Sequence, residues 1–452
     1  MVEPHNLIER IESRMARIVV WGAGQIGLSS ALSLAASGFS CTAVDINREL
    51  VEKLNQGEVP FAHHGDWVGL PIASFMAAGR FRACTELAEA DAAEADIHLV
   101  CVNTDAAERP HAAQIHAVLR QIASLLDGRR ERMVSVESTI VPAWVEEDIA
   151  ALPVLVGEHT HLVAAPRRDW FLRDELDLRT VARVVGTHRP SSREVARRFY
   201  ATISDDVVLA SDWRHAALSK IVENTLRFVD IVLTNQLNLA LPDHDVAEIM
   251  RLAATKWNVP SYHPSFGIGG YCVPLAPLYL SCEVANDSEL PLLRAAMEAD
   301  ARYADRLAER LQLEGPELVG ILGLSYASNS TIYARSPGVR LAQSLASRGV
   351  QVIVHDPYLT PEEVRERYDL SWLAYPDDLS LCSLLLVATP HDAYRDLRER
   401  LHELCPHLPV IDNLGEFRQV LDDETIEYRE MGTPLLDLHV RPGDVAAGDA
   451  GR

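Results

Sequence analysis

The chain has 452 residues, enough for about three domains of ordinary size, and 48% of them are hydrophobic. The formal net charge of −23 argues against nucleic acid and anionic membrane as partners, and an anionic small substrate would need a local pocket of positive charge. No apolar run reaches the ~18 residues that a membrane span needs, and the N-terminus lacks the core of a signal peptide.

The seven cysteines are scattered, odd in number and without CxxC spacing. This pattern favours a reducing cytoplasm and argues against a disulfide framework or a metal site. The basic residues are almost all arginine, because only three of the 42 are lysines. A lysine that persists in such a chain is a candidate for a role that needs an ammonium group. The three are Lys53, Lys220 and Lys256.

The first domain begins with a dinucleotide-binding pattern. Residues 17–21 read as a buried strand, a GAGQIG turn and an apolar helix to about Ser37 follow, and residues 40–44 form a second strand that ends at Asp45. In a GxGxxG turn the first glycine makes the bend, the second admits the pyrophosphate and the third lets helix and strand pack. The acid should accept from the ribose hydroxyls and repel a 2′-phosphate, so NAD is favoured over NADP. The predicted cofactor-binding residues of this pattern are Gly22, Gly24, Gln25, Ile26, Gly27 and Asp45.

Further strands, at 96–102 and 132–136, continue the sheet. Ligands of an open parallel sheet lie beyond the C-terminal strand ends. Thr104 and Glu137 follow these strands and are therefore predicted to line the nicotinamide side, with Ser138 assigned to the cofactor. The alternative is that they cap turns or helices.

Residues 212–241 show helical periodicity and end before Pro242. Lys220 and Asn224 are four residues apart and share a face, where they could hold an oxyanion or a catalytic water. A solvated polar face is the plainer interpretation. Such a helix between two domains is also a natural dimer element. The apolar positions expected near one stripe are Ala217, Ile221, Leu226, Val229, Leu233 and Leu237.

A glycine-rich loop, 266–274 (FGIGGYCVP), follows this helix. Its glycines would let the backbone approach a ligand closely, and the thiol of Cys272 could attack a carbonyl carbon. A lone cysteine more often simply packs. The predicted ligand contacts of the loop are Phe266, Gly267, Gly269 and Gly270.

A second series of strands, at 318–324, 350–356, 383–389 and 410–413, predicts another doubly wound sheet without a full GxGxxG. The expected fold class is α/β, with two Rossmann-like doubly wound domains joined by a long central helix. We expect an NAD-binding domain at 1–205, a helical dimerisation and cysteine region at 206–308, a nucleotide- or substrate-binding domain at 309–440 and a disordered tail at 441–452.

The ordered set of motifs resembles the nucleotide-sugar 6-dehydrogenases, that is, the UDP-glucose, GDP-mannose and UDP-N-acetylmannosamine dehydrogenases, and the loop is most similar to the last group. The resemblance covers about residues 16–417. It implies oxidation of a sugar C6 alcohol to a carboxylate with two NAD, in a dimer. It assigns Cys272 as the thiohemiacetal and thioester nucleophile, Lys220 and Asn224 as oxyanion and water-holding groups, and Thr104 as a relay partner.

The chain departs from this family at four places. Ala276 stands where relatives have an aspartate thought to assist proton transfer, and Arg167 follows Pro166 where many have glutamate. Two cations that bind the nucleotide diphosphate are replaced by alanine, at 327 and 334, and Tyr271 precedes the cysteine where relatives have Ser or His. Replacement anion contacts are expected from Arg167, Arg168 and Arg335.

Three functions stay open on this basis. The first is a four-electron oxidation of a primary alcohol on an anionic, nucleotide-linked substrate. The second is a two-electron oxidation on the same fold, because thioester hydrolysis would be impaired. The third is a non-catalytic, NAD-binding relative. The yield of NADH per substrate separates them: two, one or none.

Overall fold

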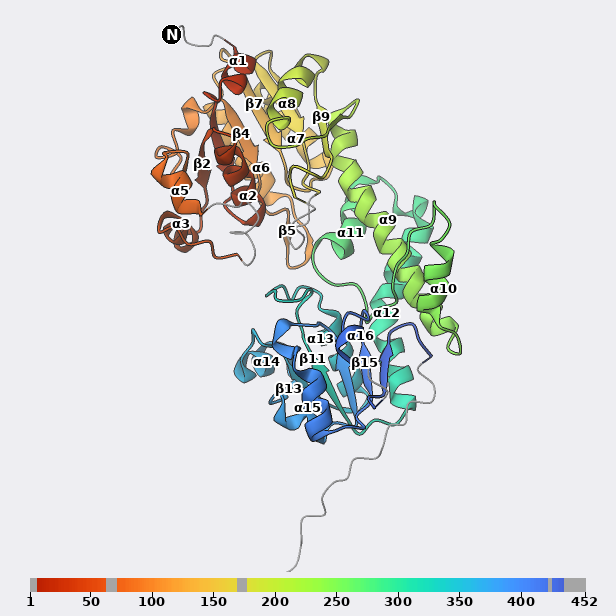
Figure 1. Ribbon diagram of the computed structural model, residues 1–452. Helices are drawn as coiled ribbons and strands as arrows, with labels where there is room; N and C mark the ends of the chain where they lie inside the picture. The colour runs from red at the N-terminus through yellow and green to blue at the C-terminus, as the bar shows by residue number, and fades with distance from the viewer. Residues whose placement is uncertain (1–5, 62–70, 169–176, 422–424, 435–452) are drawn as a thin grey trace, which may run out of the picture. The chain divides into compact units, whose positions relative to one another are not determined.

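The chain divides into two compact units (Figure 1). The computed structural model describes residues 6–61, 71–168, 177–421 and 425–434. The first unit is Met1–Glu223 with Leu278–Ala285, and the second is Asn224–Pro277 with Asn286–Arg452. The predicted central region, 206–308, is thus shared between them, and the predicted disordered tail lies outside the described residues.

The first unit is built on an eight-stranded sheet of order β10-β9-β8-β7-β4-β1-β2-β3. All neighbouring strands are parallel except β8 and β9. Helical connections join the parallel strands, as the strand–helix alternation of the sequence predicts. The strands are β1 (Arg17–Trp21), β2 (Ser40–Val44), β3 (Phe81–Cys84), β4 (Ile97–Val100), β7 (Arg132–Val136), β8 (Thr160–Ala164), β9 (Arg183–Thr187) and β10 (Val207–Leu209), and a separate hairpin pairs β5 (Asp105–Ala106) with β6 (Arg109–Pro110).

Alternate residues of the central strand β1 supply two different cores. Ile18 and Val20 pack with α1, α2, α3, α5 and α8, whereas Val19 and Trp21 pack with α6, α7 and the start of α9 (Trp213–Ala240). This period of two follows from the pleat, and it explains why a strand covered on both faces is apolar throughout. The helices of this unit are α1 (Leu7–Glu12), α2 (Gln25–Ala36), α3 (Arg48–Asn55), α5 (Ile72–Ala77), α6 (Ala113–Leu125), α7 (Pro142–Ala151) and α8 (Arg193–Tyr200), with 3₁₀ turns η1 (Ala92–Glu94), η2 (Pro153–Val156) and η4 (Pro190–Ser192).

The second unit carries a six-stranded parallel sheet of order β13-β12-β11-β14-β15-β16. Its strands are β11 (Leu318–Leu322), β12 (Gln351–His355), β13 (Ser371–Trp372), β14 (Leu384–Val387), β15 (Val410–Asp412) and β16 (Tyr428–Glu430). Its helices are α10 (Val246–Ala253), α12 (Pro291–Leu313), α13 (Pro337–Ser347), α14 (Pro361–Tyr368), α15 (Leu397–Leu404) and α16 (Arg418–Leu421), with 3₁₀ turns η5 (Asp287–Glu289), η6 (Asp377–Leu381) and η7 (Asp392–Tyr394). The predicted second doubly wound sheet is confirmed.

The long predicted helix is α9 (Trp213–Ala240), and a second shared helix, α11 (Cys272–Glu283), begins at the loop cysteine. The division between the units passes through both helices. The predicted apolar stripe of α9 is wrong in part: Ala217 and Ile221 are buried, but Leu226 and Leu233 are 62% and 54% exposed. Periodicity alone could not separate a buried face from an apolar face that the chain itself leaves uncovered.

Candidate active site

The turn between β1 and α2 has the shape that a dinucleotide needs. Gly22 has φ +95°, and a Cβ there would lie 2.6 Å from the Cys101 carbonyl oxygen. A Cβ on Gly27 would lie 1.9 Å from the Gly22 oxygen. A Cβ on Gly24 would meet nothing within 4 Å, so this glycine leaves open space in front of the helix. Gly24 is the N-cap of α2 and has no capping side chain, so the positive end of the helix faces that space, where a pyrophosphate fits.

Asp45 follows β2 and closes this turn. Its Oδ2 accepts from the Ala23 N–H at 2.7 Å, and its Oδ1 accepts from the Asn47 N–H at 2.9 Å. Asp45 is partly exposed, and each carboxylate oxygen can accept a further hydrogen bond. The residues present therefore fit a dinucleotide whose ribose carries two free hydroxyls.

The second unit repeats this geometry but closes it. Asp356, which follows β12, is fully buried. Its Oδ2 accepts from the N–H groups of Leu324 and Ser325 at 2.7 and 3.1 Å. Its Oδ1 accepts from the Tyr333 hydroxyl and the Tyr358 N–H at 2.9 and 3.0 Å. Because both oxygens are used twice, this acid has no capacity left for a ribose.

Thr104 and Ser138 bind the backbone of neighbouring strand ends. The Thr104 hydroxyl donates to the Thr139 oxygen at 2.6 Å, and the Ser138 hydroxyl donates to the Val102 oxygen at 2.7 Å. Tyr279 of α11 donates its hydroxyl proton to the Thr104 oxygen at 2.7 Å, and its own oxygen lies 2.9 Å from the Thr104 hydroxyl. The Thr104 hydroxyl proton is already donated to the Thr139 oxygen, so Thr104 can accept a hydrogen bond from a ligand but cannot donate one in a proton relay.

Glu137 lies in the interior, in a network of protein groups. Its carboxylate accepts from the Ser30 hydroxyl at 2.6 Å and from the Tyr200 hydroxyl at 3.0 Å. It pairs with Arg183 at 2.6 Å and with Arg167 at 3.8 Å. Its side chain is fully buried, and these partners are all within the first unit. The predicted nicotinamide contact is therefore enclosed by protein, and its surroundings point to a structural role.

Arg167 belongs to the same network. Its guanidinium donates to the Ile26 oxygen at 3.0 Å and to the hydroxyls of Ser30 and Ser29 at 2.6 and 3.0 Å. The residue is 6% exposed. The surroundings of Arg167 thus do not favour the predicted substrate contact, because the group binds the helix that presents the dinucleotide turn.

Lys220 and Asn224 are both buried on α9, 9% and 3% exposed. The Lys220 ammonium lies 3.9 Å from a carboxylate oxygen of Glu223, and the Lys220 side chain is 11% exposed. The Asn224 Oδ1 has no hydrogen-bond partner among the described residues. A buried acceptor without a partner is costly, so its position suits a bound water or substrate hydroxyl.

Cys272 is exposed and is the first residue of α11. The thiolate is the nucleophilic form of cysteine, and a substrate can reach an exposed side chain. By contrast, burial raises the pKa of Cys101 and raises the pKa of Cys41 too, so these thiols are unsuited to the same chemistry. The exposed cysteines are Cys272 and Cys282.

The glycines before Cys272 meet protein side chains. A Cβ on Gly269 would lie 2.7 Å from Pro337, and one on Gly270, where φ is +79°, would lie 3.2 Å from the Tyr326 ring. The Gly270 N–H donates to the Ala334 oxygen at 2.9 Å. The loop glycines therefore let the loop seat on the segment after β11. Phe266 is also a core residue, since it is 1% exposed and packs in the main cluster of the second unit.

Arg335 has φ +47°, a conformation that favours glycine. It lies near Asp300. Burial raises the pKa of the Asp300 carboxyl, and the charges of Arg340 and Arg335 partly oppose this rise. The predicted anion contact therefore already has a carboxylate in its surroundings.

Glu223, Tyr279 and Tyr326 were not predicted from the sequence. Glu223 stands three residues after Lys220, a spacing that places two side chains side by side on a helix, and this signal was available. Tyr279 and Tyr326 make contacts across long sequence separations, with Thr104 and with Gly270, which no local pattern reveals.

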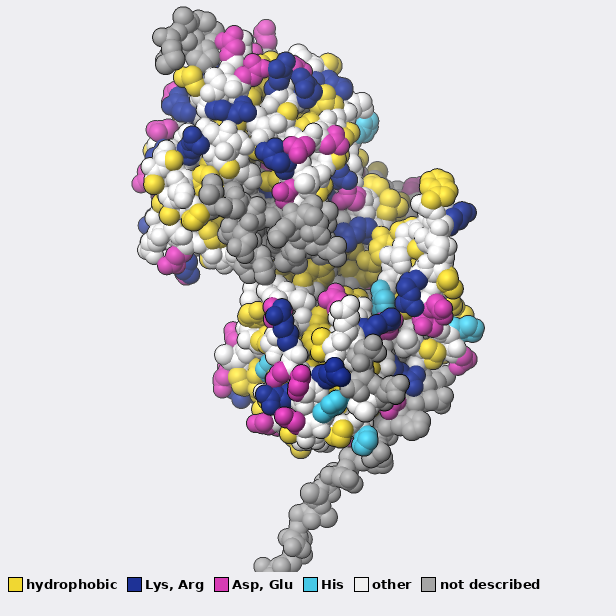
Figure 2. All heavy atoms as spheres, in the orientation of Figure 1, with side chains coloured by type: hydrophobic (Ala, Val, Ile, Leu, Met, Phe, Trp, Pro, Cys, Tyr) yellow, Lys and Arg dark blue, Asp and Glu magenta, His cyan; other side chains and the backbone are white. Residues whose placement is uncertain are grey.

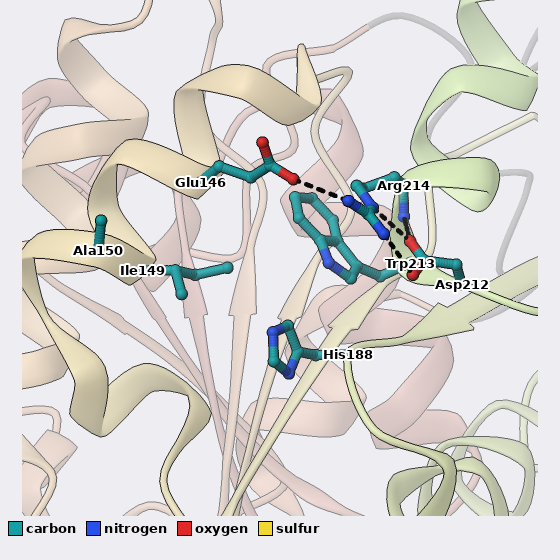
Figure 3. A pocket seen from close by; sticks show the side chains of 7 residues that line it. All are labelled: Glu146, Ile149, Ala150, His188, Asp212, Trp213 and Arg214. Carbon is teal, nitrogen blue, oxygen red and sulfur yellow. Dashed lines mark hydrogen bonds and ion pairs between the residues drawn. The ribbon is translucent and has the colours of Figure 1, made fainter.

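A hollow of about 310 Å³ opens elsewhere on the first unit (Figure 3). Arg214 lies across it and pairs with Glu146 at 3.2 Å and with Asp212 at 2.8 Å. None of the predicted site residues lines this hollow. Within the described ranges, no cluster of His, Cys, Asp and Glu could hold a metal ion, and no helix is long and apolar enough to cross a membrane.

Three domains of one protein family match this chain, in the order N-terminal, central and C-terminal. They are the NAD binding domain of the UDP-glucose/GDP-mannose dehydrogenase family at residues 16–204, its central domain at 214–302 and its UDP binding domain at 320–418.

Individual relatives match over nearly their full length. A UDP-N-acetyl-D-mannosamine dehydrogenase of Pyrococcus horikoshii is 25% identical over 88% of this chain and 94% of its own. An NDP-N-acetyl-D-galactosaminuronic acid dehydrogenase of Ralstonia solanacearum is 27% identical over 90% of this chain and 97% of its own. The solved structure of UDP-D-ManNAc dehydrogenase from Pyrococcus horikoshii superposes with a TM-score of 0.78, at 23% identity, over 92% of this chain and 99% of that one. This likeness confirms the two-domain α/β fold.

Proposed function

We infer the reaction of this chain from one premise, which is that it belongs to the UDP-glucose/GDP-mannose dehydrogenase family. It is an NAD-dependent oxidoreductase that acts on a CH–OH group. We propose that its substrate is a nucleotide-linked sugar whose primary alcohol becomes a carboxylate. The feature that supports this most is the exposed thiol of Cys272 at the start of α11.

The proposed route balances over two oxidations. Loss of a hydride from the alcohol carbon and a proton from its oxygen gives an aldehyde. The Cys272 sulfur adds to the carbonyl carbon, and the oxygen takes a proton, which gives a thiohemiacetal. Loss of a second hydride gives a thioester, which water cleaves to the acid and the free thiol. NAD, when bound, accepts a hydride in each oxidation.

The residues of α9 have roles that follow from their chemistry. Lys220 carries an ammonium that would stabilise the oxygen anion formed when sulfur or water attacks the carbonyl carbon. Asn224 has a buried Oδ1, without a partner among the described residues, that would accept from the attacking water. Asp45 and the β1–α2 turn would hold the cofactor, and Thr104 would accept a hydrogen bond at the strand end.

The stoichiometry of NADH tests the route. With UDP-N-acetylmannosamine, UDP-glucose and GDP-mannose as a panel, we expect two NADH for each carboxylate formed from the accepted sugar. A yield of one NADH with accumulation of aldehyde would replace this proposal by the two-electron alternative. That alternative is favoured by Ala276, which is 3% exposed and supplies no carboxylate. No NADH with any primary alcohol of the panel would overturn both.

The nucleophile is tested by paired variants. Cys272→Ser should retain NAD binding and lose acid formation, because an alkoxide is a poorer leaving group than a thiolate and holds the acyl group on the protein. Cys282→Ser is the matched control, since Cys282 is also exposed on α11 and has no assigned role. Full acid production by Cys272→Ala would exclude this thiol as the nucleophile.

The same proposal includes a homodimer. Figure 2 shows hydrophobic side chains on the surface of the protein. In the second unit, exposed apolar side chains lie on α9, on α10 and in the segment after α10: Leu226, Leu233, Ile249, Leu252, Trp257 and Val259. A second copy would cover them. Light scattering should give twice the chain mass, and Leu226→Asp with Leu233→Asp should give monomers. A wild-type monomer at all concentrations would contradict this.

The seven free cysteines fit a cytoplasmic location, which is part of the proposal.

A further inference from the structure

A chain of three charged side chains in the first unit ends at Lys220. Arg168 donates from Nε to a Glu223 oxygen at 2.7 Å and from Nη1 to the Ala182 oxygen at 3.0 Å. The other Glu223 oxygen lies 3.9 Å from the Lys220 ammonium. Arg168 comes from the segment after β8, Ala182 directly precedes β9, and the other two side chains are on α9. Three segments of the fold therefore meet at the Arg168 guanidinium.

The geometry divides the two oxygens of Glu223 between unequal partners. The contact with Arg168 is a short, charge-assisted hydrogen bond, whereas the contact with Lys220 is an ion pair without hydrogen-bond distance. The side chains of Arg168 and Glu223 are 28% and 30% exposed, and that of Lys220 is 11% exposed. The Glu223 carboxylate thus lies near the Lys220 ammonium but beyond hydrogen-bond distance, so it does not accept a hydrogen bond from that ammonium.

We propose that Glu223 is a positioning residue for Lys220 and that Arg168 fixes Glu223 in this role. Glu223 borders the Lys220 ammonium and fixes its position, and Arg168 stops the carboxylate from closing on that ammonium and competing with the substrate oxygen. The inference rests on the proposed function, in which the Lys220 ammonium stabilises an oxygen anion. It also gives Arg168 a role other than the predicted contact with a substrate anion.

The first test needs no substrate. Acetic anhydride acylates only the neutral amine, and the chain has three lysines, so mass spectrometry can follow Lys220 against Lys53 and Lys256. In Glu223→Gln, acylation of Lys220 at pH 8 should rise about two- to fivefold, because the neighbouring carboxylate no longer holds the amine in place. Arg168→Met should lower it, because the freed carboxylate can close on the amine. An unchanged Lys220 rate in both variants overturns the inference.

A matched control exists on α3. Lys53 pairs with Glu49 at 2.6 Å, and the hydrogen bond and charge of Glu49 raise the pKa of Lys53. Glu49→Gln should therefore increase acylation of Lys53, leave Lys220 unchanged and leave turnover unchanged. This control shows that the assay detects the loss of a carboxylate next to an amine.

Turnover is the second readout. Glu223→Gln and Arg168→Met should each lower kcat on the order of tenfold, with the KM for NAD unchanged, because a displaced ammonium loses contact mainly with the developing charge. Arg168→Lys should recover part of the loss, since a lysine can reach Glu223 or the Ala182 oxygen but cannot bridge both. Melting temperatures within a few degrees of wild type show that the variants fold.

The outcomes separate the two proposals. A changed Lys220 reactivity in a protein that oxidises none of the nucleotide sugars upholds the positioning of Lys220 and removes the proposed substrate. An active wild-type enzyme whose kcat is unaffected by Glu223→Gln removes the positioning role and leaves the proposed function intact.

Discussion

Protein groups take the place of water around the buried Glu137 carboxylate. Two arginines and two hydroxyls surround the carboxylate, which joins the end of β7 to α2 through Ser30 and to α8 through Tyr200. The network therefore braces the helix that carries the dinucleotide turn. Its energetic weight lies less in the ion pairs than in the cost of leaving any one member unpaired.

Glu137→Gln should accordingly be one of the most destabilising isosteric changes in the first unit. Two arginines would remain buried without their counter-charge, and the free energy of unfolding should fall by about 3–5 kcal/mol. Denaturant titration measures the loss. Adding Arg167→Met to Glu137→Gln should restore part of it, and simple additivity of the two changes would contradict the coupling.

His98 makes stability depend on acid. Burial lowers its pKa to about 3, with Arg132 acting in the same direction, and its Nδ1 accepts from the Trp21 indole N–H at 3.2 Å. In the unfolded chain the imidazole takes up a proton below its ordinary pKa of 6.5, whereas folded His98 does so only near pH 3. Stability is therefore lost as the pH falls from 6.5 towards 3.

By about pH 5 this loss should reach about 2 kcal/mol. His98→Gln keeps an acceptor for Trp21 and cannot be protonated, so its unfolding free energy should change less between about pH 7 and about pH 5. Equal acid sensitivity of the two proteins, in chemical denaturation at both pH values, would assign the effect to other groups.

At the scale of single elements, two glycines of the β1–α2 turn have different roles: Gly27 is needed for packing, and Gly24 leaves space for the cofactor. Gly24 has φ −64°, and a Cβ there meets no protein atom within 4 Å, whereas one on Gly27 meets the Gly22 oxygen at 1.9 Å. Gly24→Ala should leave the melting temperature within a few degrees and weaken NAD binding at least about tenfold, because the methyl group enters the space for the pyrophosphate. Gly27→Ala should lower the melting temperature. Unchanged NAD affinity in Gly24→Ala would place the cofactor elsewhere.

Local patterns predicted the central strands of both sheets because their information is local. Strands β1, β2, β4 and β7, the GAGQIG turn and the four central strands of the second sheet follow from short apolar runs, and their bounds agree within two or three residues, whereas the edge strands β13 and β16 were not predicted. The sequence could not predict where Arg167 and the loop glycines point. An arginine after a strand end suggests a ligand contact, and only the fold shows that Arg167 instead donates to Ser29 and Ser30. Three glycines within four residues read as a ligand cradle until Tyr326 is found against them.

At the scale of the whole molecule, the chain contains two related sheets and, in the part that the structure describes, one open dinucleotide turn. Titration calorimetry should therefore give one NAD per chain, and Asp45→Ala should weaken this binding. Asp356→Asn should leave it intact and destabilise the second unit instead, because Asp356 accepts four hydrogen bonds from its own unit. A second NAD per chain, lost on mutation of Asp356, would contradict this division.

The closed acid at Asp356 bears on the order of events along the proposed four-electron route. With one open turn among the described residues, one cofactor binds at a time, so on the four-electron route the reduced cofactor must leave and an oxidised one must enter between the two oxidations. The half-oxidised sugar has to outlast that exchange. Its residence time, rather than the rate of either hydride transfer, then decides whether the enzyme releases an aldehyde or an acid, and a covalent bond to Cys272 is the means of lengthening it.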